Sequence, residues 1–199
     1  MNWTPEPDSA LLVIDVQRDF CPGGALAVAE GDRVVVPLNA AAARFAAAGR
    51  PVIATRDWHP RRTIHFQEFG GTWPPHCMQG TPGAEFHPDL ELPPSAVVVS
   101  SGMREDEDGY SAFDAVDDAG RPVADLLRAQ GVRRLYIGGL ATDYCVKASV
   151  LDARELGFDV TVLEDAVRAV NVQPGDGDRA LAAIREAGAR LTSSASVAP

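Results

Sequence analysis

Short apolar runs recur along the chain, and turn residues bound each of them. The runs are rich in β-branched side chains and nearly continuous, which is typical of strands buried on both faces of a sheet. They predict strands at residues 10–16, 51–55, 96–100, 134–138, 159–163 and 189–192.

Segments with apolar residues at helical spacing lie between these runs. In the segment 32–48, Val34, Leu38 and Phe45 lie on one predicted helix face, and Gly49 follows as a stop signal. The same pattern, again closed by glycine, predicts helices at 122–130, 142–156 and 176–187. Strands that alternate with helices indicate a three-layer α/β/α fold with a mainly parallel six-stranded sheet.

The segment 57–94 lacks any such pattern and is rich in Pro, Gly, His and aromatic residues. A loop of that length inside a compact domain is usually functional. The chain has no internal repeat and no low-complexity linker, so we expect one domain over residues 1–199.

Open parallel sheets bind ligands beyond the carboxyl ends of their strands. Four segments occupy that position here, and each carries polar or reactive side chains: 15–20, 57–59, 101–110 and 139–145. We therefore expect residues distant in sequence to converge at this end of the sheet.

Composition narrows the class of partner. The formal net charge is −10, from 18 basic and 28 acidic residues, which disfavours nucleic acid and anionic membranes. No apolar run approaches the roughly 20 residues of a membrane span, and the polar segment 1–8 is unlike a secretory signal. The three cysteines show no metal-type CxxC spacing and are typical of reduced thiols. We expect a cytoplasmic protein with a small-molecule partner, and the sequence leaves homo-oligomerisation open.

Cys145 is a candidate nucleophile. It follows a predicted strand and falls in the first turn of a predicted helix, with Thr142 or Asp143 as the helix N-cap. The free N–H groups and dipole of a helix start lower a thiol pKa, and the same groups can hold an oxyanion. A buried structural thiol is the alternative that the local sequence leaves open.

Asp15 is a candidate general base. It ends an apolar strand, and burying a carboxylate there costs free energy unless the group has a function. A turn or helix-capping aspartate fits the local sequence equally well.

All four histidines lie in the irregular segment, and we group three of them with Asp57 as candidate ligands, namely His59, His65 and His76. Asp57 and His59 are two residues apart and would face the same side of an extended segment. A mixed histidine and carboxylate set suits zinc, iron or manganese better than calcium. Histidines clustered by chance are the alternative, because no tight motif such as HExxH is present.

Six motifs follow one another along almost the whole chain. They are Asp15-Val-Gln-Arg-Asp-Phe-Cys, Gly23-Gly-Ala-Leu, Asp57-Trp-His, Trp73-Pro-Pro-His-Cys, Tyr110-Ser-Ala-Phe and Gly139-Leu-Ala-Thr-Asp-Tyr-Cys-Val-Lys. Together they resemble the nicotinamidase/pyrazinamidase branch of the isochorismatase-like cysteine hydrolases. The Asp-aromatic-His and Trp-Pro-x-His-Cys motifs mark this branch, whereas the wider family shares only the aspartate and the cysteine elbow.

The resemblance implies roles for individual residues. Cys145 would be the nucleophile and Asp15 its general base. The Leu140–Ala141 peptide would be cis, and the N–H groups of Ala141 and Cys145 would form the oxyanion hole.

The resemblance also implies one divalent transition metal, held by Asp57, His59 and His76. His65 stands where some relatives have serine and others a fourth, histidine ligand. The implied reaction is hydrolysis of nicotinamide to nicotinate and ammonia, as in NAD salvage, through a thioester. The ring nitrogen would bind the metal, and the ring would lie between aromatic side chains, namely Phe20, Trp73 and Tyr110.

One position departs from the family pattern. Relatives have a lysine nine residues before the tyrosine that matches Tyr110, and this chain has Ser101 there. The lysine completes the family's Asp–Lys–Cys triad, and a serine brings no charge. We therefore expect impaired hydrolysis. The alternatives are a sister amidohydrolase acting on another small amide and a catalytically inactive small-molecule binder.

Overall fold

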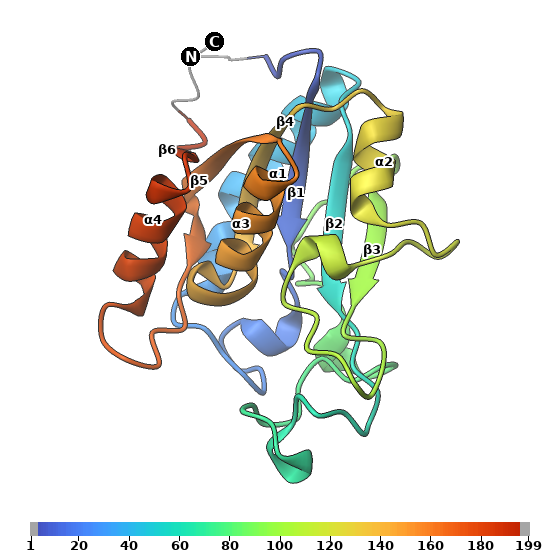
Figure 1. Ribbon diagram of the computed structural model, residues 1–199, viewed down its shortest axis with the longest axis vertical. Helices are drawn as coiled ribbons and strands as arrows, with labels where there is room; N and C mark the ends of the chain where they lie inside the picture. The colour runs from blue at the N-terminus through green and yellow to red at the C-terminus, as the bar shows by residue number, and fades with distance from the viewer. Residues whose placement is uncertain (1–3, 196–199) are drawn as a thin grey trace.

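Six strands form one sheet in the order β3-β2-β1-β4-β5-β6 in the computed structural model, which describes residues 4–195 (Figure 1). The strands are β1 (Ser9–Ile14), β2 (Val52–Asp57), β3 (Val97–Ser101), β4 (Arg134–Leu140), β5 (Asp159–Arg168) and β6 (Arg190–Thr192). Every neighbouring pair is parallel, so the predicted sheet is confirmed and has no antiparallel member among the described residues. Residues 1–3, part of the polar segment 1–8, lie outside the described chain, as do residues 196–199.

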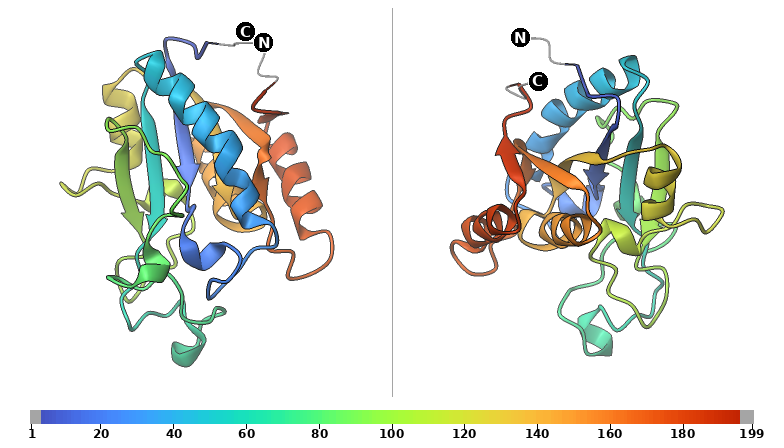
Figure 2. Two further views of the ribbon diagram at one scale, coloured as in Figure 1. Left: turned by 180° about the vertical axis from the view of Figure 1, so that it is seen from behind. Right: turned by 45° about the horizontal axis from the view of Figure 1, so that its top comes forward.

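Helices cover both faces of this sheet, as predicted. Helix α1 (Val35–Ala47) lies on one face, and α2 (Val123–Ala129), α3 (Lys147–Glu155) and α4 (Asp176–Glu186) lie on the other (Figure 2). Two helix starts differ from the prediction. A 3-10 turn, Gly31–Val34, precedes α1, and a π-helical turn, Thr142–Val146, precedes α3.

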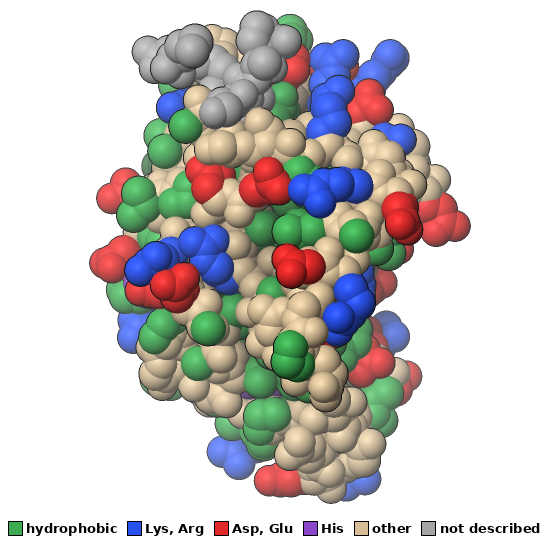
Figure 3. Space-filling view, turned by 90° about the vertical axis from the view of Figure 1, so that its left-hand side faces the viewer, with side chains coloured by type: hydrophobic (Ala, Val, Ile, Leu, Met, Phe, Trp, Pro, Cys, Tyr) green, Lys and Arg blue, Asp and Glu red, His purple; other side chains and the backbone are tan. Residues whose placement is uncertain are grey.

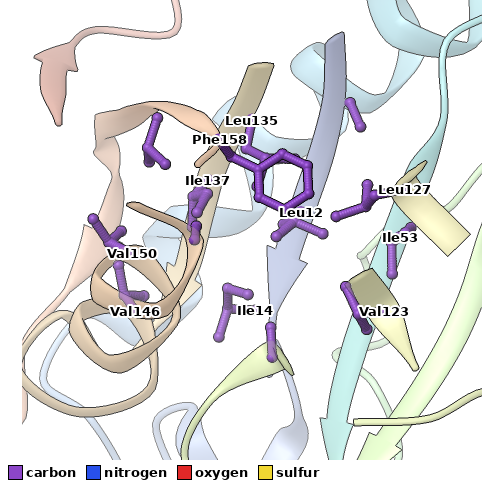
Figure 4. Close-up of a cluster of buried hydrophobic side chains, with 14 of the residues drawn as sticks. Leu12, Ile14, Ile53, Val123, Leu127, Leu135, Ile137, Val146, Val150 and Phe158 are labelled. Atoms are coloured by element: carbon purple, nitrogen blue, oxygen red, sulfur yellow. The ribbon is translucent and has the colours of Figure 1, made fainter. Parts of the chain in front are cut away.

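The core is split by the sheet into two apolar clusters. Along β1, Leu11 and Val13 belong to the cluster under α1, whereas Leu12 and Ile14 belong to the opposite one (Figure 4). Successive side chains of a strand point to opposite faces, so a strand between two helix layers must be apolar throughout. Burying each such aliphatic side chain stabilises the fold by about 1.5–3 kcal/mol.

From β1 the chain adds β2 and β3 on one side of the sheet and then β4, β5 and β6 on the other. The order of the strands therefore switches between β1 and β4, which are parallel neighbours in the middle of the sheet. Such a switch point leaves a crevice at the carboxyl ends of the strands. The irregular segment between β2 and β3 lies beyond this end of the sheet, opposite the chain termini (Figure 1).

Within the described residues, no helix is long and apolar enough to cross a membrane. Charged side chains of both signs are interspersed on the face drawn in Figure 3.

Candidate active site

The four predicted segments meet at the carboxyl end of the sheet. Asp57 and Ser101 end β2 and β3 and pair directly across the sheet, while Asp15 follows β1 and Cys145 follows β4. One ligand atom from each of Asp15, Asp57 and Cys145 lies within 4.8 Å of the others. Two buried carboxylates therefore face one buried thiol.

The predicted metal donors converge beside these groups. The ring nitrogens of His59, His65 and His76 lie within 4.8 Å of one another. Asp57 Oδ2 lies 3.5 Å from His59 Nε2 and 3.8 Å from His76 Nε2. His59 Nε2 is buried and has no hydrogen-bond partner in the described chain. An orphaned nitrogen amid further nitrogen and oxygen donors fits a divalent transition metal.

Each histidine uses its Nδ1 to contact an outer partner. The partners are the Gly102 carbonyl for His59 at 3.1 Å, the Pro74 carbonyl for His76 at 2.8 Å and Asp108 Oδ1 for His65 at 3.0 Å. These oxygens only accept, so each Nδ1 carries the proton and each Nε2 keeps its lone pair. Burial lowers the pKa of His65, and it lowers the pKa of His76 to about 4, so both rings are neutral at pH 7.

Gly102 has a structural reason to be glycine. Its φ is +63°, and a Cβ at this position would lie 2.4 Å from Cε1 of His59. A side chain here would displace the imidazole that the Gly102 carbonyl orients.

Cys145 lines the pocket, but its local setting differs from the prediction. Burial raises the pKa of its thiol, and the charges of Asp15 and Asp57 raise it further. The N-cap prediction is wrong: Ala141 is the cap residue, and the Asp143 carboxylate accepts backbone N–H groups from the segment after β5. The expected lowering of the thiol pKa is therefore not observed.

The two carboxylates have opposite pKa shifts. Burial and the neighbouring charge of Asp57 hold the pKa of Asp15 well above its usual range, against hydrogen bonds from Thr55 and Cys145. Burial also pushes the pKa of Asp57 upward, but the neighbouring histidines, His59 first, outweigh it and the pKa is lowered. Asp57 is thus the anion of the pair, and Asp15 tends to hold a proton.

Ser101 supplies no charge to this pair. Its side chain is buried and its Oγ donates to Asp57 Oδ1 at 3.4 Å. In residues 4–195, neither Asp15 nor Asp57 has a lysine or arginine partner in an ion pair. Arg104, the nearest arginine in sequence, is exposed and pairs with Asp106 and Glu107 at the surface. It does not replace the missing cation.

A pocket opens onto the thiol and the predicted metal donors. Phe20, Trp73 and Tyr110 line it, together with Cys145 and His76. Trp73 Nε1 donates to the Tyr110 hydroxyl at 2.8 Å, and the Phe20 ring lies 5.4 Å from the His76 ring. The structure thus brings the predicted aromatic residues, the thiol and the metal donors to one cavity.

The predicted cis peptide between Leu140 and Ala141 is present. A backbone hydrogen bond from Ala141 to the Cys145 thiol favours the thiolate, against burial. The Ala141 N–H therefore lies near the sulfur, and its role in an oxyanion hole stays a prediction.

The family follows from a comparison with known proteins. The family profile described as "Isochorismatase domain" matches residues 9–196. The chain belongs to the isochorismatase family. Within that family, it is 41% identical to the nicotinamidase of Escherichia coli K12, over 93% of this chain and 94% of the relative.

Two solved structures resemble the fold. A pyrazinamidase of Pyrococcus horikoshii in complex with zinc is 45% identical, with a TM-score of 0.86, and the match covers 94% of this chain and 99% of that one. A protein from L. infantum in complex with nicotinate is 36% identical, with a TM-score of 0.85 and 98% of both chains covered.

Several residues of this isochorismatase-family site carry no role in the sequence prediction. Tyr144, Leu26 and Val170 also line the pocket, and the Tyr144 ring meets the Trp73 ring edge to face at 4.8 Å. Tyr144 directly precedes the candidate nucleophile, which was the one available signal. Leu26 ends the Gly23-Gly-Ala-Leu motif, whereas Val170 is an ordinary apolar residue that only the fold brings to the site.

Gln17 is a further residue without a predicted role. Its Nε2 donates to the Asp57 carbonyl at 2.8 Å, and its Oε1 accepts the Asp57 N–H at 2.8 Å. This buried amide fixes the backbone that carries the metal-facing carboxylate.

Proposed function

We propose that this chain is a metal-assisted cysteine amidohydrolase that converts nicotinamide to nicotinate and ammonia. The observation that carries the proposal is the single pocket that the Cys145 thiol, the histidine cluster and the aromatic side chains share. The names of its relatives support the substrate, since they include a nicotinamidase and a protein solved with nicotinate.

Cys145 and Asp15 would carry the covalent chemistry. Asp15, as the carboxylate, takes the thiol proton while Cys145 Sγ attacks the amide carbon and forms a C–S bond. The N–H groups of Ala141 and Cys145 hold the oxyanion. Asp15 then passes its proton to the leaving nitrogen, the C–N bond breaks and ammonia departs. A water molecule, deprotonated by Asp15, cleaves the thioester to nicotinate and returns the thiol.

The substrate would be positioned from two sides. Asp57, His59 and His76, with His65 as a fourth ligand, would hold zinc, iron or manganese, which offers a Lewis-acid position for the ring nitrogen. A similar pyrazinamidase was solved in complex with zinc, which supports a metal at this site. The aromatic residues would hold the ring faces, namely Phe20, Trp73 and Tyr110.

Ser101 makes this chain a slow member of its branch in our proposal. With Asp15 as the base, Asp15, Asp57 and Cys145 must together carry two negative charges in a buried site. A cation at position 101 would relieve that cost, and a hydroxyl does so only weakly. The same observation favours a second candidate function, a small-molecule binder that keeps the pocket and has lost turnover.

Product formation tests the proposal. We expect the chain, supplied with zinc and nicotinamide, to form ammonia and nicotinate in equal amounts, slowly but above the uncatalysed background. Binding of nicotinamide without either product would favour the binder, and failure to bind would contradict both candidates.

Metal content gives a separate prediction. We expect one equivalent of divalent metal per chain in protein purified without chelator, and a loss of nearly all of it in His76→Ala, which lacks one of the clustered donors. His87→Ala is the matched control, because His87 lies outside the cluster and its ring Nδ1 accepts the backbone N–H of Asp89. Elemental analysis of the three proteins checks this, and stoichiometric metal in His76→Ala would refute the ligand assignment.

A further inference from the structure

His65 differs from the other two clustered histidines in what holds it. His59 and His76 contact backbone carbonyls through Nδ1, whereas His65 contacts a side chain, the carboxylate of Asp108. A carbonyl is a fixed feature of the fold. A carboxylate adds charge, and a substitution can remove it.

The contact between Asp108 and His65 crosses the boundary between solvent and site. The His65 ring is 3% exposed and stacks on the His59 ring at 4.6 Å, while the Asp108 side chain is 57% exposed. The two segments are also joined by their backbones, since Ile64 N–H donates to the Glu105 carbonyl at 2.9 Å. The surface segment 105–108 thus contacts the buried imidazole of His65 and fixes its position.

We propose that Asp108 is a positioning residue for the metal site and acts through His65, an inference that rests on the metal site of the proposed function. Its carboxylate accepts the Nδ1–H at 3.0 Å, which selects the tautomer whose Nε2 lone pair faces the other donors. A carboxylate on the far nitrogen also makes the imidazole a stronger donor. His65 would thereby become a full fourth ligand.

Two substitutions separate orientation from charge. Asp108→Asn keeps an oxygen that accepts the Nδ1–H and removes the charge, whereas Asp108→Ala removes both. We expect zinc affinity to fall by about 10- to 100-fold in Asp108→Ala, the range typical of such outer partners. We expect a smaller loss in Asp108→Asn, because water screens the charge of a side chain this exposed.

A double-mutant cycle distinguishes action through His65 from a general effect. Zinc affinity is measured by competition with a chromophoric chelator for the wild type, Asp108→Ala, His65→Ala and the double variant. We expect Asp108→Ala to have no further effect once His65 is alanine. Asp106→Ala is the matched control, since its carboxylate lies in the same surface segment, pairs with Arg104 and contacts none of the histidines.

The outcomes are distinct. Equal zinc affinity in Asp108→Ala and Asp106→Ala would overturn the inference and leave the metal site standing. An equal loss with and without His65 would overturn the route through that ring. A wild-type chain that binds no zinc at all would overturn the metal site, and with it this inference. Unfolding temperatures measured with chelator present should be the same for Asp108→Ala and the wild type, which excludes a folding defect as the cause.

Discussion

Replacing Ser101 with lysine is expected to raise kcat for nicotinamide hydrolysis by about 10²–10³-fold, the effect of one preorganised charged donor. Ser101 lies at the end of β3, directly beside Asp57, and its Oγ contacts that carboxylate. An ammonium there would face Asp15, Asp57 and Cys145, which at present share no lysine or arginine partner in residues 4–195.

Ligand affinity should change far less than turnover. The pocket side chains that would hold the ring are separate from position 101, so we expect the dissociation constant of nicotinamide to stay within several-fold. Ser101→Met is the matched control, because it adds a side chain of similar length without charge. Steady-state ammonia release and calorimetric binding compare the three proteins. Fast turnover by the unaltered chain, with no gain from lysine, would show that another group performs the task.

The same substitution should also move the pH dependence. The pKa values of Asp15 and Cys145 are both raised by burial and by neighbouring negative charge. A cation favours the charged forms of both groups, so lysine lowers both pKa values. The rising limb of the pH–rate profile should therefore shift to lower pH in Ser101→Lys and stay in place in Ser101→Met.

Replacing Cys145 with alanine is expected to abolish hydrolysis, with a loss of at least about 10³-fold, since groups that act as one catalytic unit fail together. The loss is best measured in the Ser101→Lys background, where the starting rate is higher. Nicotinamide should still bind, because the ring contacts remain.

The matched control for this loss is Cys21→Ala. Cys21 is also buried, but it does not line the pocket, and burial raises its pKa to about 11. Its removal should leave turnover largely intact. Comparable hydrolysis rates in Cys145→Ala and in the protein that keeps Cys145 would show that Cys145 is not the nucleophile.

Much of the fold was predictable because its signals are local. Continuous apolar runs such as Leu11–Ile14 are required wherever a strand lies between two helix layers, and glycine after each helix marks its end. The convergence of Asp15, Asp57 and Cys145 followed from the rule that parallel strands present their carboxyl ends at one edge.

What failed depended on contacts between distant segments. Asp143 was expected to cap the helix, yet its carboxylate accepts the N–H groups of Val170 and Asn171, 27 and 28 residues away. The thiol pKa was expected to fall at a helix start, yet burial and two carboxylates outweigh that local effect. Asp108 is likewise invisible locally, because only the fold places it on His65.

The roles of the site residues rest in the end on chemistry at one substrate. The most direct test compares the rates at which two amides, nicotinamide and benzamide, are hydrolysed to their acids. Benzamide has the same shape as nicotinamide but lacks the ring nitrogen. Both rates are measured for the zinc-loaded protein with Ser101 and for its Ser101→Lys variant. We expect nicotinate formation by both proteins, faster with lysine, and much slower hydrolysis of benzamide. Equal rates on the two amides, or no nicotinate from either protein above the Cys145→Ala background, would contradict a metal-assisted nicotinamidase.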